Sequence, residues 1–249
     1  MAEIQVLDKQ TIDQIAAGEV VERPSSVVKE LVENSLDAGA SHVTVEIKDG
    51  GISYIRITDN GCGIDASQIQ KAFLRHSTSK IRRAEDLNQI FSLGFRGEAL
   101  SSIAAVSQVE LITKAKDEFM GSRFTIEGGV NGSLEEIGAP DGNTFVVRNL
   151  FYNTPVRKKF LKTAQTEAAY ITGLMEKYAL CRPDVSFKVI VNGQVRLQSP
   201  GNGQLEDAIY RVFGREIIGD LMPICLEDND LVIRGFIAKP VVSRGNRNF

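Results

Sequence analysis

Cysteine and histidine are scarce in this 249-residue sequence, which contains three of the first and two of the second. Cys62, Cys181 and Cys225 lie far apart without metal-ligand spacing, and neither His42 nor His76 has a Cys, Asp or Glu partner at such spacing. We therefore expect reduced thiols and no structural metal.

Targeting and membrane-spanning segments are also missing from the sequence. The first ten residues have neither a basic start nor an apolar run, and no segment approaches the length that crosses a bilayer. This pattern predicts a protein that is neither secreted nor anchored in a membrane. A cytoplasmic location follows, or a nuclear one in a eukaryote.

Two common nucleotide-binding motifs are absent. No segment matches G-x-x-x-x-G-K-[ST], which excludes a Walker-type site, and no G-x-G-x-x-G is present. The net charge of −3 argues against a uniformly basic nucleic-acid binder. Two stretches nevertheless contain basic residues and no acid, 142–166 and the part after residue 230. They are either solvated faces or parts of a groove that holds the DNA backbone without reading sequence.

Residues 27–39 read as a helix with two different faces. At 100° per residue, Glu30, Asn34 and Asp37 fall within about 60° of one another. The opposite arc is mostly apolar and consists of Val27, Val28, Leu31, Val32, Ser35 and Leu36. For a lone helix the simpler interpretation is a solvated polar face, so the elements that follow decide between the two.

A β-hairpin follows this helix and ends in a carboxylate. Apolar residues alternate along 43–47 and 55–57, with a glycine-rich turn between them. The second strand ends at Asp59, and two glycines, Gly61 and Gly63, follow it. This arrangement is typical of a place where the backbone approaches a flat ligand closely.

These residue types suit the binding and hydrolysis of a nucleotide. Asp59 can accept a hydrogen bond from the exocyclic amine of adenine, the two glycines leave room for the ring, and Ala38 is small enough to admit it. Magnesium usually keeps several waters and takes phosphate oxygens, so the neutral oxygen of Asn34 can suffice as its protein ligand. Glu30, one turn earlier, lies where a water attacking the terminal phosphate needs a general base.

A phosphate cradle is expected next, and residues 70–97 supply two candidates. One is Thr78-Ser79-Lys80, and the other is the loop 94–100, which opens a helix running to about residue 106. Glycines before helices are also common capping devices, so the loop alone is weak evidence. The loop becomes stronger evidence for a phosphate-binding site when it is considered together with the proposed base, metal ligand and purine acceptor. Lys80 either pairs with phosphate or is solvated.

Together these residues resemble the Bergerat ATP site, which gyrase, heat-shock chaperones, sensor histidine kinases and mismatch-repair proteins share. The resemblance rests on Glu30 with Asn34, Asp59-x-Gly61-x-Gly63, the loop 94–97, and Thr144. Within that superfamily, the sequence is similar over essentially its whole length to the N-terminal region of the MutL family of DNA mismatch-repair proteins. Four segments are the most similar: 15–24, 29–39, 94–100 and 149–155. The one local departure is at 142–144, where the family usually reads Gly-Thr-Thr and this sequence has Gly-Asn-Thr.

The resemblance implies ATP and Mg²⁺ as cofactors and a role for each matching residue. Glu30 becomes the catalytic base, Asn34 the magnesium ligand and Asp59 the adenine acceptor, and the hydroxyl of Thr144 is expected beside the purine. The other implied ATP contacts are Ala38, Gly61, Gly63, Ile64, Thr78, Ser79, Lys80, Gly94, Phe95, Arg96, Gly97, Glu98 and Leu100.

The implied function is an ATP-hydrolysing switch of DNA mismatch repair that dimerises when nucleotide binds. A lid at 70–97 orders around the nucleotide, and an N-terminal arm at 1–22 helps two copies close. The implied partners are a second copy or a paralogue, a MutS-type mismatch-recognition protein, and the DNA backbone, but no membrane. Two alternatives stay open: another ATPase of the superfamily, such as a topoisomerase subunit or chaperone, and a nucleotide-gated scaffold without catalysis. The local segments oppose the first, and the presence of Glu30 opposes the second.

The order of elements predicts an α+β fold, with a mixed, largely antiparallel sheet and helices on one face, over residues 1–200. Residues 199–203 read as a linker, and 204–249 as the beginning of a second α+β domain. In the family this second domain continues further and supplies a lysine to the terminal phosphate. We therefore expect a fragment that binds ATP and magnesium but hydrolyses ATP slowly and dimerises weakly.

Overall fold

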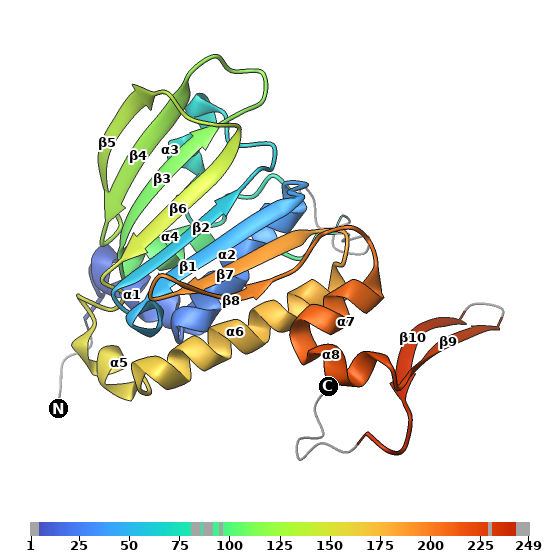
Figure 1. Cartoon of the computed structure of the whole chain (residues 1–249). Helices are drawn as coiled ribbons and strands as arrows, with labels where there is room; N and C mark the ends of the chain where they lie inside the picture. The colour runs from blue at the N-terminus through green and yellow to red at the C-terminus, as the bar shows by residue number, and fades with distance from the viewer. Residues whose placement is uncertain (1–4, 81–85, 87–91, 95–96, 229–230, 243–249) are drawn as a thin grey trace.

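The computed structural model describes residues 5–80, 86, 92–94, 97–228 and 231–242. Eight strands form one sheet, in the order β5-β4-β3-β6-β2-β1-β7-β8 (Figure 1). Only β1 and β7 pair in parallel, and the other neighbouring pairs are antiparallel. The predicted mixed, largely antiparallel sheet is therefore confirmed. The strands are β1 (His42–Lys48), β2 (Tyr54–Asp59), β3 (Gln108–Lys114), β4 (Gly121–Glu127), β5 (Val130–Ile137), β6 (Gly142–Arg148), β7 (Ser186–Val191) and β8 (Gln194–Gln198).

One face of the sheet is covered by helices. Along β1, β2 and β3 buried and less buried residues alternate, as expected for strands that pack on one side only. The longer helices are α1 (Lys9–Val20), α2 (Pro24–Asp37) and α6 (Ala164–Cys181), and α4 (Ala99–Ala105) is shorter (Figure 1). The remaining short helices of this part are η1 (Asp49–Gly51), η2 (Ala66–Gln68), α3 (Ile69–Ala72) and α5 (Pro155–Phe160).

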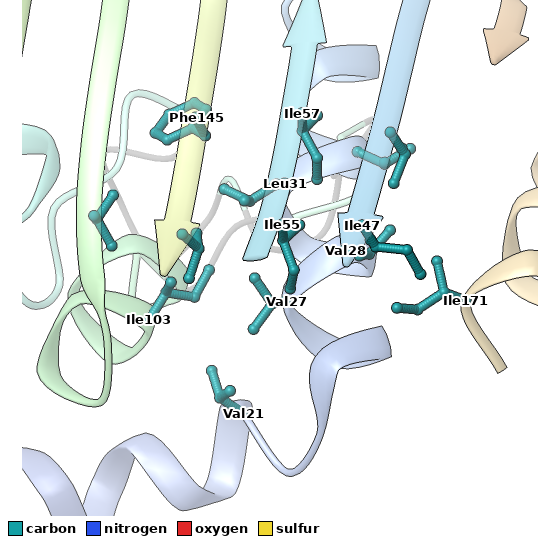
Figure 2. Close-up of a cluster of buried hydrophobic side chains, with 14 of the residues drawn as sticks. Val21, Val27, Val28, Leu31, Ile47, Ile55, Ile57, Ile103, Phe145 and Ile171 are labelled. Atoms are coloured by element: carbon teal, nitrogen blue, oxygen red, sulfur yellow. The ribbon is translucent and has the colours of Figure 1, made fainter. Parts of the chain in front are cut away.

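The core lies between α2 and the centre of the sheet. Val27, Val28 and Leu31 of α2 point toward the strands, where Ile55 and Ile57 of β2 meet them (Figure 2). All five side chains are at most 1% exposed. Full burial of one such side chain contributes roughly 1.5–3 kcal/mol. This packing fixes how α2 is rotated, and therefore which of its residues face away from the core.

The chain after β8 forms a smaller group of elements. It contains α7 (Leu205–Phe213), α8 (Arg215–Ile218) and the antiparallel pair β9 (Leu221–Asp228) and β10 (Leu231–Ala238). Helix α7 packs against α6, whereas the two-stranded ribbon stands away from the large sheet (Figure 1). A division into domains at about residue 200 remains a prediction.

Among the longer elements, α1 and β5 have no counterpart in the sequence predictions, and among the short helices η2, α3 and α8 have none. In β5, the exposure of seven of its eight residues leaves no alternation to detect. As for membranes, the described part of the chain contains no helix with both the length and the apolar character needed to cross a bilayer.

Candidate functional site

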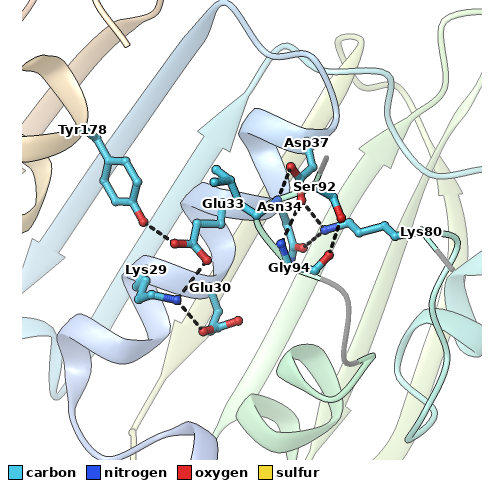
Figure 3. A network of polar contacts seen from close by, with 10 residues as sticks. Lys29, Glu30, Glu33, Asn34, Asp37, Lys80, Ser92, Gly94 and Tyr178 are labelled. Carbon is cyan, nitrogen blue, oxygen red and sulfur yellow. Dashed lines mark hydrogen bonds and ion pairs between the residues drawn. The ribbon is translucent and has the colours of Figure 1, made fainter. Parts of the chain in front are cut away.

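Helix α2 holds Glu30, Asn34 and Asp37 on one side, away from its apolar stripe (Figure 3). Pro24 starts the helix at a position where its missing N–H costs nothing. The helix ends where Gly39 takes a φ of +72°, a left-handed conformation that glycine adopts without strain. These ends and the buried stripe place the three polar residues on successive turns.

Lys80 reaches the polar side of α2 from a distant part of the chain. Its Nζ lies 3.1 Å from Asn34 Oδ1 and 2.5 Å from Asp37 Oδ2 (Figure 3). The backbone N–H groups of Leu93 and Gly94 also donate to Asp37, at 3.0 and 3.3 Å. Asp37 thus binds both predicted phosphate-binding segments, the one that ends at Lys80 and the one that begins at Gly94. The sequence analysis did not assign this role to Asp37.

The contact with Lys80 also tests whether a metal ion would fit beside Asn34. The amide oxygen of Asn34 already faces a cationic group, and oxygen is the ligand that Mg²⁺ prefers. Among the described residues no three His, Cys, Asp or Glu side chains cluster as metal ligands. Asn34 therefore fits a magnesium ion that takes its other ligands from phosphate and water.

Glu30 is held through its neighbour Lys29. The Lys29 ammonium lies 3.1 Å from Glu30 Oε1 and 2.9 Å from Glu33 Oε2, and Tyr178 of α6 donates to Glu33 Oε1 at 2.8 Å (Figure 3). Burial lowers the pKa of Lys29, but its bonds to the two glutamates outweigh this and raise it. Burial, together with the bond to Glu33, raises the pKa of Tyr178, so the phenol remains a donor.

The second carboxylate oxygen of Glu30 has no polar partner among the described residues, and 24% of the side chain is exposed. This oxygen can therefore accept a proton from a water, as a general base must. The fixed charge of Lys29 beside the other oxygen keeps the carboxylate in one orientation.

Asp59 lies at the end of β2 and is only 5% exposed. Its Oδ1 accepts from the N–H of Gly61 at 2.9 Å, and its Oδ2 lies 2.7 Å from the hydroxyl of Ser35 on α2. The amide of Asn143 donates to the same carboxylate, at 3.1 Å from Oδ1. All of these neighbours are donors, so the carboxylate is held purely as an acceptor.

A chain of hydrogen bonds fixes Asn143 from the other side. Thr113 Oγ1 accepts from the N–H of Ile64 at 2.8 Å and donates to Asn143 Oδ1 at 2.8 Å. The segment that follows Asp59 is therefore connected to the Asp59 carboxylate by hydrogen bonds through Thr113 and Asn143.

The structure places Thr144 one position beyond this cluster, and its expected contact with the purine stays a prediction. Asp59 pairs with Asn143 across β2 and β6, and Thr144 pairs with Thr58 one position further on. Because neighbouring residues of a strand point to opposite faces, the Thr144 hydroxyl lies on the other face, 3.2 Å from that of Thr58. Asn143, at the position where this sequence departs from the related family, takes the place beside Asp59.

The two glycines after Asp59 are also required by the packing of the protein itself, and their expected contact with a ring stays a prediction. A Cβ on Gly63, whose φ is +73°, would lie 2.1 Å from the carbonyl oxygen of Lys114. A Cβ on Gly61 would lie 2.9 Å from the Cβ of Ala38. Both positions therefore require glycine because the protein's own atoms approach closely, whether or not a ring is bound.

The remaining predicted ATP contacts lie in the lid, at the start of α4 and beside the core. Thr78 accepts from the N–H of Lys80 at 3.1 Å, and Ser79 is exposed. Gly97 has a φ of +63° and packs against the backbone of Ser77. Glu98 caps the start of α4 and contacts His76, while Ile64 and Leu100 pack partly against the core. Phe95 and Arg96 lie outside the described residues.

Two surface cavities lie away from this cluster. One is bordered by β3, β4 and β6, and the other by α1, α4 and the turn between β4 and β5. None of the predicted site residues lines either of them. Beside Asn34 and Asp37, the side chain of Lys80 and the backbone of Gly94 occupy the neighbouring space (Figure 3).

Comparisons with known families and known sequences point to the same group of proteins. Residues 22–134 match the family described as histidine kinase-, DNA gyrase B- and HSP90-like ATPase. The whole chain is 62% identical to the DNA mismatch repair protein MutL of Agathobacter rectalis and 49% identical to that of Desulforamulus reducens. It spans 38% and 39% of the length of these curated relatives.

A solved structure extends the match to three dimensions. The Aquifex aeolicus MutL ATPase domain complexed with ADP aligns with a TM-score of 0.70 and 32% identity. The alignment covers 91% of this chain and 80% of that domain. On sequence and fold together, this chain belongs to the MutL family of DNA mismatch-repair proteins.

Proposed function

We propose that this region binds ATP with Mg²⁺ and hydrolyses it, as the nucleotide-driven switch of a DNA mismatch-repair protein. The observation that carries the proposal is the arrangement on α2. Glu30 has one carboxylate oxygen without a partner in the described part of the chain, and one turn later the amide oxygen of Asn34 already faces a cation. The related domain solved with ADP supports a nucleotide as the ligand.

Each residue has a defined task in this proposal. Asp59 accepts from the adenine amine and orients the base, and Asn34 holds the magnesium ion. Glu30 takes the proton of the attacking water through its unpartnered oxygen. A bound Mg²⁺ supplies positive charge that neutralises the phosphate oxygens. Lys80 and the N–H groups near Gly94 leave Asp37 and turn toward phosphate, which couples the lid to nucleotide binding.

The proposed partners are supported by exposed side chains and by family membership. On the N-terminal arm, Leu7, Ile12 and Ile15 expose apolar surface, at 50%, 42% and 56%, which a second copy or a paralogue can cover. MutL membership supports a MutS-type mismatch-recognition partner and a cytoplasmic setting.

A DNA backbone contact is supported by uncompensated positive charge. Lys158, Lys159 and Lys162 lie on and just after α5, are exposed, and have no ion-pair partner within the described ranges. Of the other basic stretch, Arg234 pairs with Glu227 and Lys239 with Asp220. Among the described residues of the two stretches, the unpaired charge is therefore concentrated near α5, where it suits sequence-independent phosphate contacts.

A turnover assay tests the proposal. The chain should release phosphate from ATP in the presence of Mg²⁺ and not in excess chelator. Glu30→Ala should reduce turnover by roughly 10²- to 10⁴-fold while leaving ATP affinity within a few-fold. The matched control Glu206→Ala, at an exposed glutamate on α7, should leave both unchanged.

Three outcomes of that assay separate the alternatives. Retained turnover in Glu30→Ala would contradict the assignment of the base. Binding of ATP without any hydrolysis would favour the non-catalytic scaffold instead. The slow turnover proposed for these residues alone is checked by comparison with a longer MutL chain containing them: equal rates would remove that part of the proposal.

A further inference from the structure

A chain of four polar side chains connects helix α6 to the proposed general base (Figure 3). The hydroxyl of Tyr178, on α6, donates to Glu33 Oε1 at 2.8 Å. The ammonium of Lys29 lies 2.9 Å from Glu33 Oε2 and 3.1 Å from Glu30 Oε1. The chain ends at this last carboxylate, whose second oxygen has no polar partner in the described ranges. The contacts of Tyr178 and Glu33 therefore affect how Glu30 is held.

Glu33 is the most buried charged member of this chain. Only 11% of its side chain is exposed, and each carboxylate oxygen has a hydrogen-bonding partner. A buried carboxylate that loses a partner is strongly destabilised, so Glu33 is confined to the orientation that satisfies both oxygens. The ammonium of Lys29 therefore binds an acceptor that has one favourable orientation.

Helix geometry explains why Lys29 needs this anchor. Glu33 lies four residues after Lys29 and on the same side of α2, whereas Glu30 is the next residue and projects about 100° away. The Lys29 side chain is 47% exposed, and an exposed ion pair contributes at most about 1 kcal/mol. Without Glu33, the ammonium would exchange between solvated positions. With Glu33, it is held between the two carboxylates.

The packing of α6 fixes the other end of the chain. The Tyr178 ring packs partly against the core, with its centroid 6.3 Å from that of Phe187 on β7. Burial, together with the bond to Glu33, raises the pKa of the Tyr178 phenol, so the hydroxyl keeps its proton and acts as the donor. Helices α2 and α6 also contact each other directly. The hydroxyl therefore reaches Glu33 from a packed helix.

We propose that Lys29, Glu33 and Tyr178 are positioning residues for ATP hydrolysis. They hold Glu30 in the orientation that receives the proton of the attacking water. This inference rests on the proposed function of Glu30 as the general base. Lys29 occupies one oxygen of the Glu30 carboxylate, so only the other oxygen faces the water. The proton moves from the water to that oxygen, while the ammonium and the phenol keep their protons.

The rate of hydrolysis should depend on this orientation, because a general base acts only within hydrogen-bond reach of its water. A displacement of about 1 Å can cost on the order of 100-fold in rate. The affinity for ATP should not depend on it, since the positioning residues are not those proposed to hold adenine, magnesium or phosphate. A loss of rate without a loss of affinity therefore distinguishes positioning from a general structural role.

The test measures single-turnover ATP hydrolysis with Mg²⁺ in the full 249-residue chain, and the dissociation constant of a nonhydrolysable ATP analogue. Lys29→Met keeps the aliphatic stem but removes the ammonium, and it should slow hydrolysis by about 10- to 100-fold. Lys29→Arg keeps the charge and should stay within about fivefold of the wild type. Tyr178→Phe keeps the ring and should slow hydrolysis by about 3- to 10-fold. Each variant should bind the analogue within about twofold of the wild-type affinity.

A double variant shows whether Tyr178 acts through Lys29. Adding Tyr178→Phe to Lys29→Met should change the rate by less than about twofold, because the link to Glu30 is already broken. Independent effects would multiply instead.

Two matched controls lie on α6. Tyr170→Phe removes a hydroxyl but keeps the ring, which makes the contact with Arg23. Lys177→Ala removes the charge of an exposed lysine. Both variants should hydrolyse ATP at the wild-type rate.

The outcomes that overturn the inference differ from those that overturn the proposed function. The inference alone is removed if Glu30→Ala is inactive while Lys29→Met keeps wild-type turnover, or if the effects of Lys29→Met and Tyr178→Phe multiply. A Lys29→Met variant that loses analogue affinity in proportion to its rate also removes it. If Tyr178→Phe fails to fold, equal rates in Lys29→Met and Lys29→Arg contradict positioning by the charge. A wild type without turnover, or a Glu30→Ala with retained turnover, removes the proposed function and the inference with it.

Discussion

Asp59→Asn separates the structural role of this residue from its proposed binding role. With its oxygen toward the N–H of Gly61, an asparagine places its new amide group where Oδ2 faces Ser35. The Ser35 hydroxyl also lies 3.1 Å from the carbonyl oxygen of Leu31. Its proton can therefore move to that carbonyl, and its oxygen can accept from the new amide. The fold offers the variant a complete set of hydrogen bonds.

The magnitudes follow from these bonds. Charge-assisted bonds to the carboxylate become neutral ones, so the free energy of unfolding should fall by about 1–2 kcal/mol. The adenine amine, in contrast, meets a donor in place of an acceptor. We expect ATP affinity to fall by about 1–3 kcal/mol, which is roughly a 5- to 150-fold increase in Kd.

Urea denaturation and calorimetric titration with ATP measure the two effects separately. Asp117→Asn serves as the control, because Asp117 is exposed and has no polar partner in the described residues; its stability should change by less than about 0.5 kcal/mol. A loss of stability above about 4 kcal/mol in Asp59→Asn would refute the Ser35 rearrangement. Unchanged ATP affinity would refute the role of Asp59 in reading the base.

Three further predictions concern other residues. Asn34→Ala should weaken ATP binding in Mg²⁺ but not in chelator, and a wild type whose ATP affinity is the same in both conditions would contradict a magnesium ligand there. Substitution of Lys158, Lys159 and Lys162 together by Ala should weaken DNA binding and reduce its salt dependence. The slope of log K against log salt concentration should become shallower by up to about 2.7, which is about 0.9 for each lost phosphate contact. An unchanged slope would show that DNA binds elsewhere. Burial raises the pKa of Glu110, but its bonds from Arg123 and Arg148 outweigh this and lower it below the ordinary 4.5. Glu110→Gln should therefore cost stability at neutral pH, and the cost should vanish as the pH falls below 4.5 and through the lowered pKa. A cost that persists in acid, measured by denaturation of both proteins, would exclude this linkage.

Elements with strong periodicity could be predicted from the sequence. Helix α2, the hairpin β1–β2 and the hairpin β7–β8 lie within a few residues of their expected bounds. At the last of these, Asn192 and Gly193 have φ values of +50° and +80°, as the turn chemistry requires. Local signals sufficed in these cases, because each element is specified by its own residues.

Contacts between distant segments could not be predicted in the same way. Whether Asn143 or Thr144 faces Asp59 depends on the register between β2 and β6, which are far apart in sequence. Both residues are polar and neighbouring, so alternation gives no preference. Asp37 was recognised on the polar side of its helix, but its contact with Lys80 arises only when residues 43 positions apart meet.

Segments 15–24 and 149–155, which carry the family resemblance outside the site, are connected through Arg157. Arg157, just beyond the second, donates to the carbonyl oxygen of Ile15 at 3.1 Å, and a Cβ on Gly18 would lie 1.9 Å from its guanidinium. Asn153 donates to the carbonyl oxygen of Ala105, at the end of α4.

The segment that begins at residue 149 thus binds α1 on one side and α4 on the other. Helix α4 starts directly after the glycine loop, and α1 belongs to the arm proposed to close two copies. None of these residues contacts the predicted nucleotide site within the described chain. Their hydrogen bonds instead connect α4 with α1. We expect a lid that is ordered by nucleotide to act on the arm through these two helices. The segment after β6 therefore joins the helix that follows the glycine loop to the N-terminal helix, through hydrogen bonds that lie outside the predicted nucleotide site.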